Sequence, residues 1–77
     1  MHNVVLPELG EGIEKATVAC WHIKEGQSVT ADDDIVEMVT DKATFNVSAG
    51  TSGIVKRIFV KEGQDAKIGE TLAVIAS

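Results

Sequence analysis

The sequence predicts a small all-β domain in which short strands form two sheets packed face to face. Three observations support this prediction: the chain has only 77 residues, it contains an internal repeat, and no stretch of helix length keeps apolar residues at helical spacing. A chain of this length forms one domain with a single compact core, and it has no room for a deep cleft between two lobes.

The repeat relates the two halves of the chain. Lys24-Glu25-Gly26-Gln27 recurs as Lys61-Glu62-Gly63-Gln64, a shift of 37 positions from Lys24 to Lys61. The similarity continues on both sides of these motifs. Two copies are too few to stack as a solenoid, so they predict a closed body with pseudo-two-fold symmetry, in which each half buries the apolar face of the other.

Short runs rich in β-branched and aromatic residues predict the strands. The runs cover residues 4–6, 17–23, 35–39, 44–48, 54–60 and 72–76. Pro7 ends the first run, and Gly26 and Gly63 follow charged pairs at positions typical of turns, because glycine adopts positive φ without steric cost. With the shorter segments between them, these runs predict about eight strands in two sheets that share one core.

The repeat also assigns inward and outward faces. Trp21 and Ile23 align with Ile58 and Val60, whereas Cys20 aligns with Arg57, so we expect Trp21 and Ile23 to point inward and Cys20 to lie at or near the surface. Cys20 is the only cysteine, which excludes a disulfide within the chain. A domain of this size without disulfides is more typical of a reducing compartment.

The charge balance narrows the possible partners. Asp and Glu total 12 against 7 Lys and Arg, which gives a formal charge of −5. The chain has too few cations to replace the counterions of a nucleic acid, and it gains nothing from an anionic membrane. We therefore expect protein partners with basic surfaces, and neither nucleic acid nor membrane binding. The N-terminus has no signal-peptide pattern.

The candidate functional residue is Lys42. Asp41-Lys42-Ala43 separates a strand that ends near Thr40 from one that begins at Thr44, at the junction of the two repeats. Because Thr40 aligns with Ser77, the turn should lie at the opposite end of the symmetric body from the chain termini. On this spacing alone, a lysine at a hairpin tip is most often only a solvated charge.

Longer motifs around this turn resemble the lipoyl domains of the acyltransferase (E2) components of 2-oxo acid dehydrogenase complexes. The resemblance covers essentially the whole chain. It rests on Leu6-Pro7-Glu8-Leu9-Gly10-Glu11-Gly12, Trp21-His22-Ile23-Lys24-Glu25-Gly26, Val36-Glu37-Met38-Val39-Thr40-Asp41-Lys42-Ala43, Gly53, Val60-Lys61-Glu62-Gly63 and Leu72-Ala73-Val74-Ile75. Asn46 and Ser48-Ala49-Gly50 depart from the family, in which many members have an acidic residue and a proline-containing turn.

The resemblance implies a fold, a cofactor and a role. The fold is a flattened barrel-sandwich hybrid of two four-stranded antiparallel sheets. The cofactor is lipoic acid in amide linkage to Lys42, attached by a lipoate ligase or an octanoyl transferase. In the family, the lipoyl group takes an acyl group from the thiamine-diphosphate decarboxylase (E1), carries it to the E2 core for transfer to coenzyme A, and is reoxidised by dihydrolipoamide dehydrogenase (E3). The domain is therefore a carrier without catalytic residues of its own.

Neighbouring residues receive roles from the same resemblance. Asp41 and Ala43 would identify the turn to the attaching enzyme and to E1, although Asp41 is also simply a good turn residue. Leu9-Gly10-Glu11-Gly12 and Thr40 are expected to contribute to recognition by E1, and the alternative for this loop is a glycine-rich connector. Glu37-Met38-Val39-Thr40 favours the pyruvate or branched-chain type of complex.

Two other functions remain open. A biotin carrier domain of a carboxylase shares this fold, but its lysine typically stands between two methionines rather than between Asp41 and Ala43. An unmodified domain of the same fold would act only as an interaction module, and only an observed modification distinguishes that case.

The sequence favours no metal site and no enzyme centre. Asp32-Asp33-Asp34 lacks the alternation and the closing glutamate of a calcium loop. His2 and His22 have no Cys or His at the usual ligand spacing, and Gly10-Glu11-Gly12 has neither the rest of a phosphate loop nor a following helix. We expect residues 1–77 to be an N-terminal domain excised from a longer E2 chain, which acts in the prokaryotic cytoplasm or the mitochondrial matrix.

Overall fold

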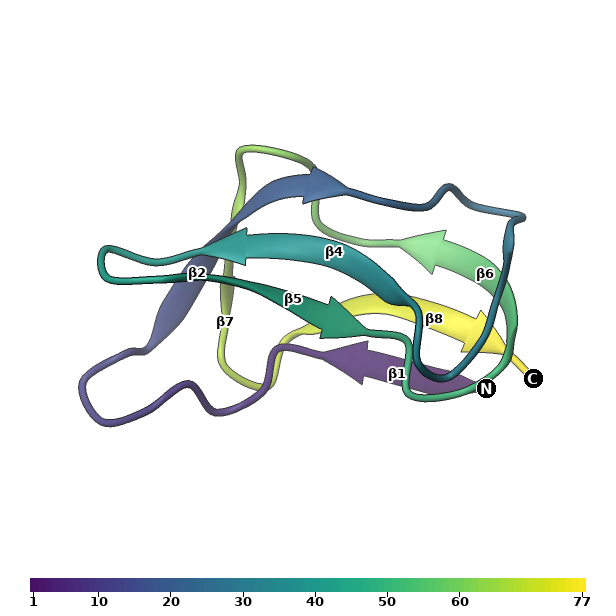
Figure 1. The fold of residues 1–77 in the computed structure, drawn as a ribbon, viewed down its shortest axis with the longest axis horizontal. Coiled ribbons are helices and arrows are strands. Elements are labelled where there is room, and N and C mark those ends of the chain that lie inside the picture. The colour runs from purple at the N-terminus through teal and green to yellow at the C-terminus, as the bar shows by residue number, and fades with distance from the viewer.

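The computed structural model describes residues 1–77, which form eight strands and no helix. The strands are β1 (His2–Val5), β2 (Lys15–Trp21), β3 (Ser28–Val29), β4 (Asp34–Val39), β5 (Thr44–Ser48), β6 (Gly53–Ile58), β7 (Asp65–Lys67) and β8 (Thr71–Ala76). They form two antiparallel four-stranded sheets, in the orders β1-β8-β6-β3 and β5-β4-β2-β7 (Figure 1). The predicted all-β sandwich is confirmed. None of its elements is a helix suited to crossing a membrane.

The sheet orders follow directly from the repeat. A shift of 37 residues brings β2, β3 and β4 onto β6, β7 and β8, and β5 takes the place of β1. The order of one sheet then becomes the order of the other. Each sheet takes two strands from each half: β1 and β3 join β6 and β8, and β5 and β7 join β2 and β4. The two halves are therefore interlocked, which gives a small chain one shared core.

Backbone hydrogen bonds of the two repeated turns join the halves in matching pairs. The N–H of Gly26 donates to the carbonyl of Val55 at 2.7 Å, and the N–H of Gly63 donates to the carbonyl of Val18 at 2.8 Å. Gly26 has a φ of 90° and Gly63 a φ of 85°, values that L side chains rarely adopt. Glycine at these two positions therefore allows each turn to bond to the opposite half.

The glutamates of the same turns repeat this exchange with their side chains. The Glu25 carboxylate accepts the backbone N–H of Ile58 at 2.9 Å, and the Glu62 carboxylate accepts that of Trp21 at 3.4 Å. Both acceptors cap the last residue of a strand in the other half. The Lys-Glu-Gly-Gln motif is thus a connection between halves as well as a turn.

The core lies between the sheets and contains only apolar side chains. Sixteen buried residues form one cluster, and no polar or charged residue is buried. Ile23 belongs to this cluster, and the half-buried Trp21 packs against it while its indole N–H donates to the carbonyl of Val60 at 2.7 Å. The inward direction predicted for Trp21 and Ile23 is confirmed, and Cys20 is half-buried.

Some strand limits differ from the sequence-based expectation. The apolar runs over 17–23 and 54–60 continue beyond the strands, because β2 ends at Trp21 and β6 at Ile58. Ile23 and Val60, two residues beyond the ends of these strands, are nevertheless buried. The sequence did not locate β3 and β7, since runs of two and three residues carry no periodicity.

The body is elongated, with principal extents of 33 × 20 × 18 Å. Both termini lie at one end, and the β4–β5 turn lies at the opposite end, as predicted (Figure 1). At the terminal end, β6 begins so close to β8 that a Cβ on Gly53 would clash with the carbonyl oxygen of Ala76. This contact explains the glycine at that position.

Candidate functional site

The turn that carries Lys42 closes a regular hairpin. Val39 pairs with Thr44 at the ends of β4 and β5, so residues 40–43 form the turn. The Thr40 N–H donates to the carbonyl of Ala43 at 2.8 Å and closes the turn at its base. Lys42 is exposed near the apex.

The Thr40 hydroxyl holds the backbone on both sides of the lysine. Its oxygen accepts the backbone N–H of Lys42 at 3.3 Å and that of Ala43 at 3.1 Å. The side chain of Lys42 has no ion-pair partner, because the one salt bridge in the structure joins Lys15 to Asp65. The turn therefore presents a fixed backbone and a free primary amine.

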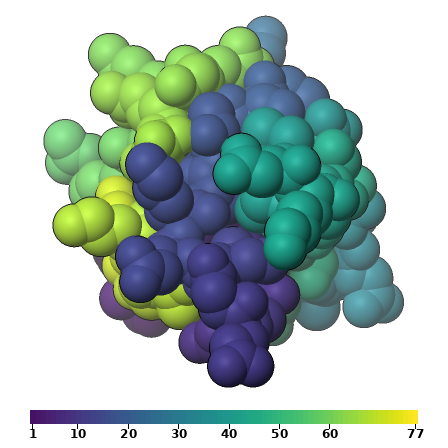
Figure 2. Space-filling view, turned by 90° about the vertical axis from the view of Figure 1, so that its left-hand side faces the viewer, coloured from purple at the N-terminus to yellow at the C-terminus, as the bar shows by residue number.

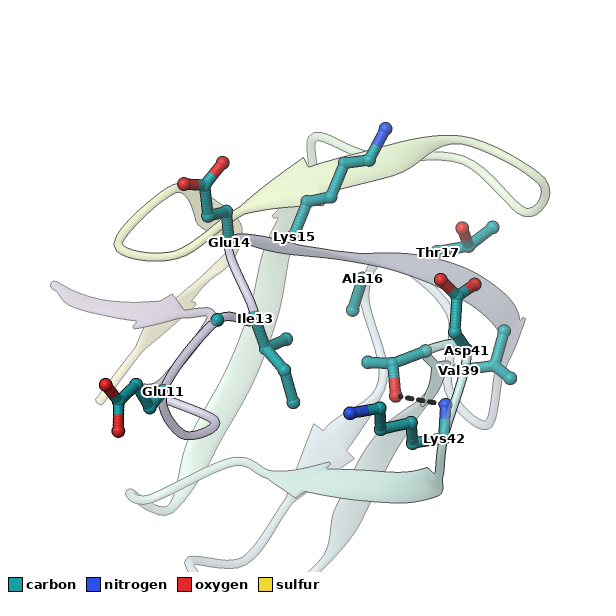
Figure 3. Close-up of a pocket in the computed structure, with 11 residues that line it drawn as sticks. Glu11, Ile13, Glu14, Lys15, Ala16, Thr17, Val39, Asp41 and Lys42 are labelled. Carbon is teal, nitrogen blue, oxygen red and sulfur yellow. Dashed lines mark hydrogen bonds between the residues drawn. The ribbon is translucent and has the colours of Figure 1, made fainter.

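A groove separates the hairpin from the β1–β2 loop, residues 6–14. The two segments share one end of the molecule, where the turn is teal and the loop is dark blue (Figure 2). The groove measures about 560 Å³ and is lined by Glu11, Gly12, Ile13, Glu14, Lys15, Ala16, Thr17, Val39, Thr40, Asp41 and Lys42. The side chain of Lys42 extends across it toward Ile13 (Figure 3). Its size suits a small ligand, but its lining is mostly polar, unlike that of a typical substrate pocket.

The residues of the Leu9–Gly12 segment, which the sequence links to partner recognition, lie in different environments. Glu11 and Gly12 line the groove beside Lys42. Leu9 is half-buried and packs against the core, and Gly10 is exposed and does not line the groove. The N–H of Ile13 donates to the Gly10 carbonyl at 3.3 Å, which bends the loop. Leu9 is thus an anchor, while Glu11 and Gly12 contribute to the lining of the groove that Lys42 also lines.

Sequence reasoning missed the second half of this loop. Ile13 and Glu14 of the loop also line the groove, as does Lys15 at the start of β2, although the motif predicted for partner recognition ended at Gly12. Ile13 is a partly exposed apolar residue between Gly12 and the charged pair Glu14 and Lys15, and that contrast was an available signal. Asp41 lines the groove next to Lys42, and Ala43 is exposed outside the lining.

An acidic residue at the edge of the groove connects β7 to β2. Asp65 accepts a hydrogen bond from the Thr17 hydroxyl and lies 3.3 Å from the Lys15 ammonium. The Thr17 bond, the Lys15 bond and the Lys15 charge hold the pKa of Asp65 below its usual value. Lys15 is thereby engaged, which leaves Lys42 as the free amine of the groove.

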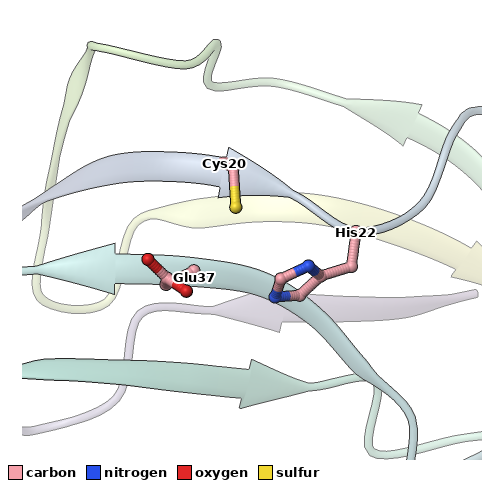
Figure 4. A group of neighbouring side chains, drawn as sticks. All are labelled: Cys20, His22 and Glu37. Carbon is pink, nitrogen blue, oxygen red and sulfur yellow. The ribbon is translucent and has the colours of Figure 1, made fainter.

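A second group of polar side chains lies outside the groove, on the outer face of the sheet β5-β4-β2-β7. Candidate ligand atoms of Cys20, His22 and Glu37 lie within 4.8 Å of one another (Figure 4). Burial, followed by the charges of Glu37 and Glu62, raises the pKa of the Cys20 thiol. His22 was not expected to bind a metal, but it lies two residues after Cys20, and the pairing of β2 with β4 places Glu37 opposite Cys20.

The fold and the turn define the class of protein: a small β-sandwich that presents one lysine at a hairpin tip, as carrier domains do. Residues 2–75 match the family model Biotin_lipoyl, described as "Biotin-requiring enzyme". The chain therefore belongs to the biotinyl/lipoyl carrier-domain family.

Curated relatives of the chain are E2 components. The succinyltransferase components of the 2-oxoglutarate dehydrogenase complex from Rickettsia conorii and Buchnera aphidicola are 38% and 42% identical over 73 residues, 95% of this chain and 18% and 17% of theirs. The acetyltransferase component of the pyruvate dehydrogenase complex from Staphylococcus aureus is 33% identical over 70 residues, 91% of this chain and 16% of its own length. The chain thus spans less than a fifth of each of these relatives.

A solved structure agrees with the family assignment. The lipoyl domain of the 2-oxoglutarate dehydrogenase complex from Azotobacter vinelandii matches with a TM-score of 0.79 and 35% sequence identity, over 97% of this chain and 95% of that one. The resemblance to lipoyl domains of E2 components is therefore confirmed, together with the fold class.

Proposed function

We propose that this chain works as a lipoyl carrier domain of a 2-oxo acid dehydrogenase complex, with lipoic acid attached to Lys42. The presentation of Lys42 is the observation that carries the proposal. Its side chain is exposed and unpaired on a turn held by Thr40, at the end of the body far from both termini. The relatives support the cofactor, because they are named for a dihydrolipoyllysine residue.

Attachment needs only the free amine and a recognisable turn. The Nζ atom of Lys42 would form an amide bond with the carboxyl carbon of an activated lipoyl or octanoyl group, while the activating group leaves and the amine loses its protons to solvent or the enzyme. A lipoate ligase or an octanoyl transferase would supply the activated group. Asp41 and Ala43 flank the amine and are exposed, so the attaching enzyme can contact both.

The domain contributes tethering and recognition. When bound, the lipoyl group supplies a disulfide that can accept an acyl group and two electrons. Attachment removes the charge of Lys42 and leaves Glu11, Glu14 and Asp41 along the groove, beside the engaged Lys15. This acidic surface suits a basic partner face, and tethering raises the local concentration of the attached group there. E1, the E2 core and E3 are the partners expected of such a domain.

The relatives bear on the 2-oxo acid, the parent chain and the compartment. They divide between 2-oxoglutarate and pyruvate complexes, so the preference for pyruvate or branched-chain acids stays a prediction. We expect residues 1–77 to be the N-terminal domain of a longer E2 chain. The relatives are bacterial and support action in the cytoplasm.

The first test is the intact mass of the chain after incubation with lipoate, ATP and a lipoate ligase. One added lipoyl group that is absent in Lys42→Arg and retained in Lys24→Arg and Lys61→Arg establishes the site. Biotin addition by a biotin ligase, with no lipoyl addition, would move the function to a carboxylase. No addition by either enzyme would leave an interaction module.

A second test identifies the 2-oxo acid. Purified E1 enzymes specific for 2-oxoglutarate, pyruvate and branched-chain acids are compared for acylation of the lipoylated chain, with the free cofactor as the control. The proposal requires that one E1 acylates the chain much faster than it acylates free lipoamide. Equal rates would contradict a recognition role for the domain.

A further inference from the structure

We propose that Cys20, His22 and Glu37 form a binding site for a zinc ion on the outer face of the sheet β5-β4-β2-β7. A thiolate, an imidazole and a carboxylate are all common zinc ligands, and three protein ligands with one open position are a known zinc arrangement. The mixed sulfur and nitrogen donors disfavour magnesium and calcium, which prefer oxygen.

A β-bulge brings the thiol to this face. In the β2–β4 ladder Val18 pairs with Met38, and Cys20 pairs with Glu37, so Ala19 is an extra residue. Without the bulge, Cys20 would point to the same side as the buried Val18. The bulge reverses this direction and places the thiol directly opposite the Glu37 carboxylate.

The imidazole completes the group from His22, the residue that directly follows β2. His22 lies two residues after Cys20, and its ring reaches toward β4, where the three side chains converge (Figure 4). All ligand atoms lie within 4.8 Å of one another. Ligands around a tetrahedral zinc ion are separated by about 3.4–3.6 Å, as its bond lengths require. His22 is exposed, and Cys20 and Glu37 are half-buried, so small side-chain rotations can close this difference.

A neighbouring strand orients the imidazole. The Nε2–H of His22 donates to Oδ1 of Asn46 on β5 at 2.8 Å. With the hydrogen on Nε2, the lone pair that a metal ion would bind is on Nδ1. Zinc-bound histidines commonly have such a partner on the second ring nitrogen, and it fixes both tautomer and orientation. Asn46 also pairs with Glu37 in the β4–β5 ladder, so one short region supplies ligands and support.

The other half of the molecule shows that the fold does not require these residues. There the repeat places Arg57 opposite Val74 across an equivalent bulge in β6, and Phe59 takes the place of His22. The Arg57 guanidinium lies 5.8 Å from the centre of the Phe59 ring. The same backbone thus carries a cation and an aromatic ring on one sheet, and three metal ligands on the other.

Cobalt titration of the chain without a lipoyl group tests this site, because the dithiol of lipoate would itself bind the metal. We expect one Co²⁺ per chain, a thiolate-to-cobalt charge-transfer band, and displacement of Co²⁺ by Zn²⁺. Cys20→Ser should abolish the band. His22→Gln and Glu37→Gln should each weaken binding at least about tenfold, whereas His2→Gln, at the other histidine, should leave it unchanged.

Two results would overturn the proposal. One is the absence of a thiolate band at millimolar Co²⁺. The other is equal weakening by His2→Gln and His22→Gln, which would place the metal elsewhere. Circular dichroism of each variant confirms the fold. If Cys20→Ser unfolds, the two conservative variants at His22 and Glu37 still decide the outcome.

Discussion

Three lysines of this domain, Lys24, Lys42 and Lys61, occupy two kinds of turn. Lys24 and Lys61 begin the repeated turns, and the N–H of each donates to the glutamine side chain three residues later, at 3.2 and 2.9 Å. The glycines and glutamates of those turns bond to the opposite half. The turn of Lys42 bonds only to itself, through the backbone and hydroxyl of Thr40.

The two kinds of turn therefore have different roles: the repeated turns stabilise the fold, and the third turn presents the Lys42 side chain. The repeated turns connect the halves, so a change there affects the whole fold. The Lys42 turn lies where the repeat is interrupted and connects nothing beyond its own hairpin. A modifying enzyme can therefore contact this turn without disturbing the contacts between the halves.

The largest effect should come from moving the lysine within its turn. In the exchange variant Asp41→Lys/Lys42→Asp the turn retains a lysine, but the amine leaves the position that Thr40 fixes. We expect lipoylation to slow by about 10²-fold, because small misplacement of a reacting group has an effect of that size. Mass spectrometry against time measures the rate, and modification at the rate of the unaltered chain would refute fixed presentation.

Next in size is a change in a repeated turn. Gly63→Ala places a side chain at a φ of 85°, which should lower the free energy of unfolding by about 1–2 kcal/mol. Ala43→Gly in the Lys42 turn should change it by no more than about 1 kcal/mol. Urea denaturation measures both, and equal losses would show that the two kinds of turn contribute alike.

The glutamates that join the halves should have a smaller effect. Glu25→Ala removes the acceptor of the Ile58 N–H and should cost about 0.5–1.5 kcal/mol. Glu62→Ala should cost less, because its bond to the Trp21 N–H is longer. Lys42→Ala is the matched control and should change stability by no more than about 0.5 kcal/mol. A larger loss in Lys42→Ala would contradict its exposed position.

Thr40 should affect presentation more than stability. Thr40→Val removes the oxygen that accepts the N–H groups of Lys42 and Ala43. We expect a loss of about 0.5–1 kcal/mol and a lipoylation rate lowered several-fold. Thr40→Ser keeps the hydroxyl and should restore most of the rate. If the serine and valine variants behave alike, the hydroxyl does not position the lysine.

The smallest expected effect is that of removing the Asp65 carboxylate, which pairs with Lys15. The lowered pKa of Asp65 means that its ionised form stabilises the fold above the unfolded-state pKa of about 3.9. This contribution is lost as pH falls through the lower folded-state value. Denaturation of Asp65→Asn and the unaltered chain should therefore differ at pH 6 and converge in acid. A difference that persists in acid would assign the effect to something other than ionisation.

The sequence by itself determined the fold class and the modified-lysine candidate. A turn depends on a few consecutive residues, so the recurrence of Lys24-Glu25-Gly26-Gln27 predicted two similar turns and hence a symmetric body. The β-branched runs predicted most strands, although their limits differ by one or two residues at several ends. Lys42 was identifiable as the candidate attachment site because the motifs that flank it are contiguous in the sequence. The symmetry of the repeat placed it at the end opposite the termini.

Only the tertiary structure decided which distant residues meet. β3 and β7 are too short for a periodic signal, and each depends on a partner strand from the other half. The groove joins Ile13 to a hairpin far along the chain. Cys20 meets Glu37 because a bulge reverses its direction. Strand pairing and bulges are non-local, so the spacing of residues within one strand could not reveal these meetings.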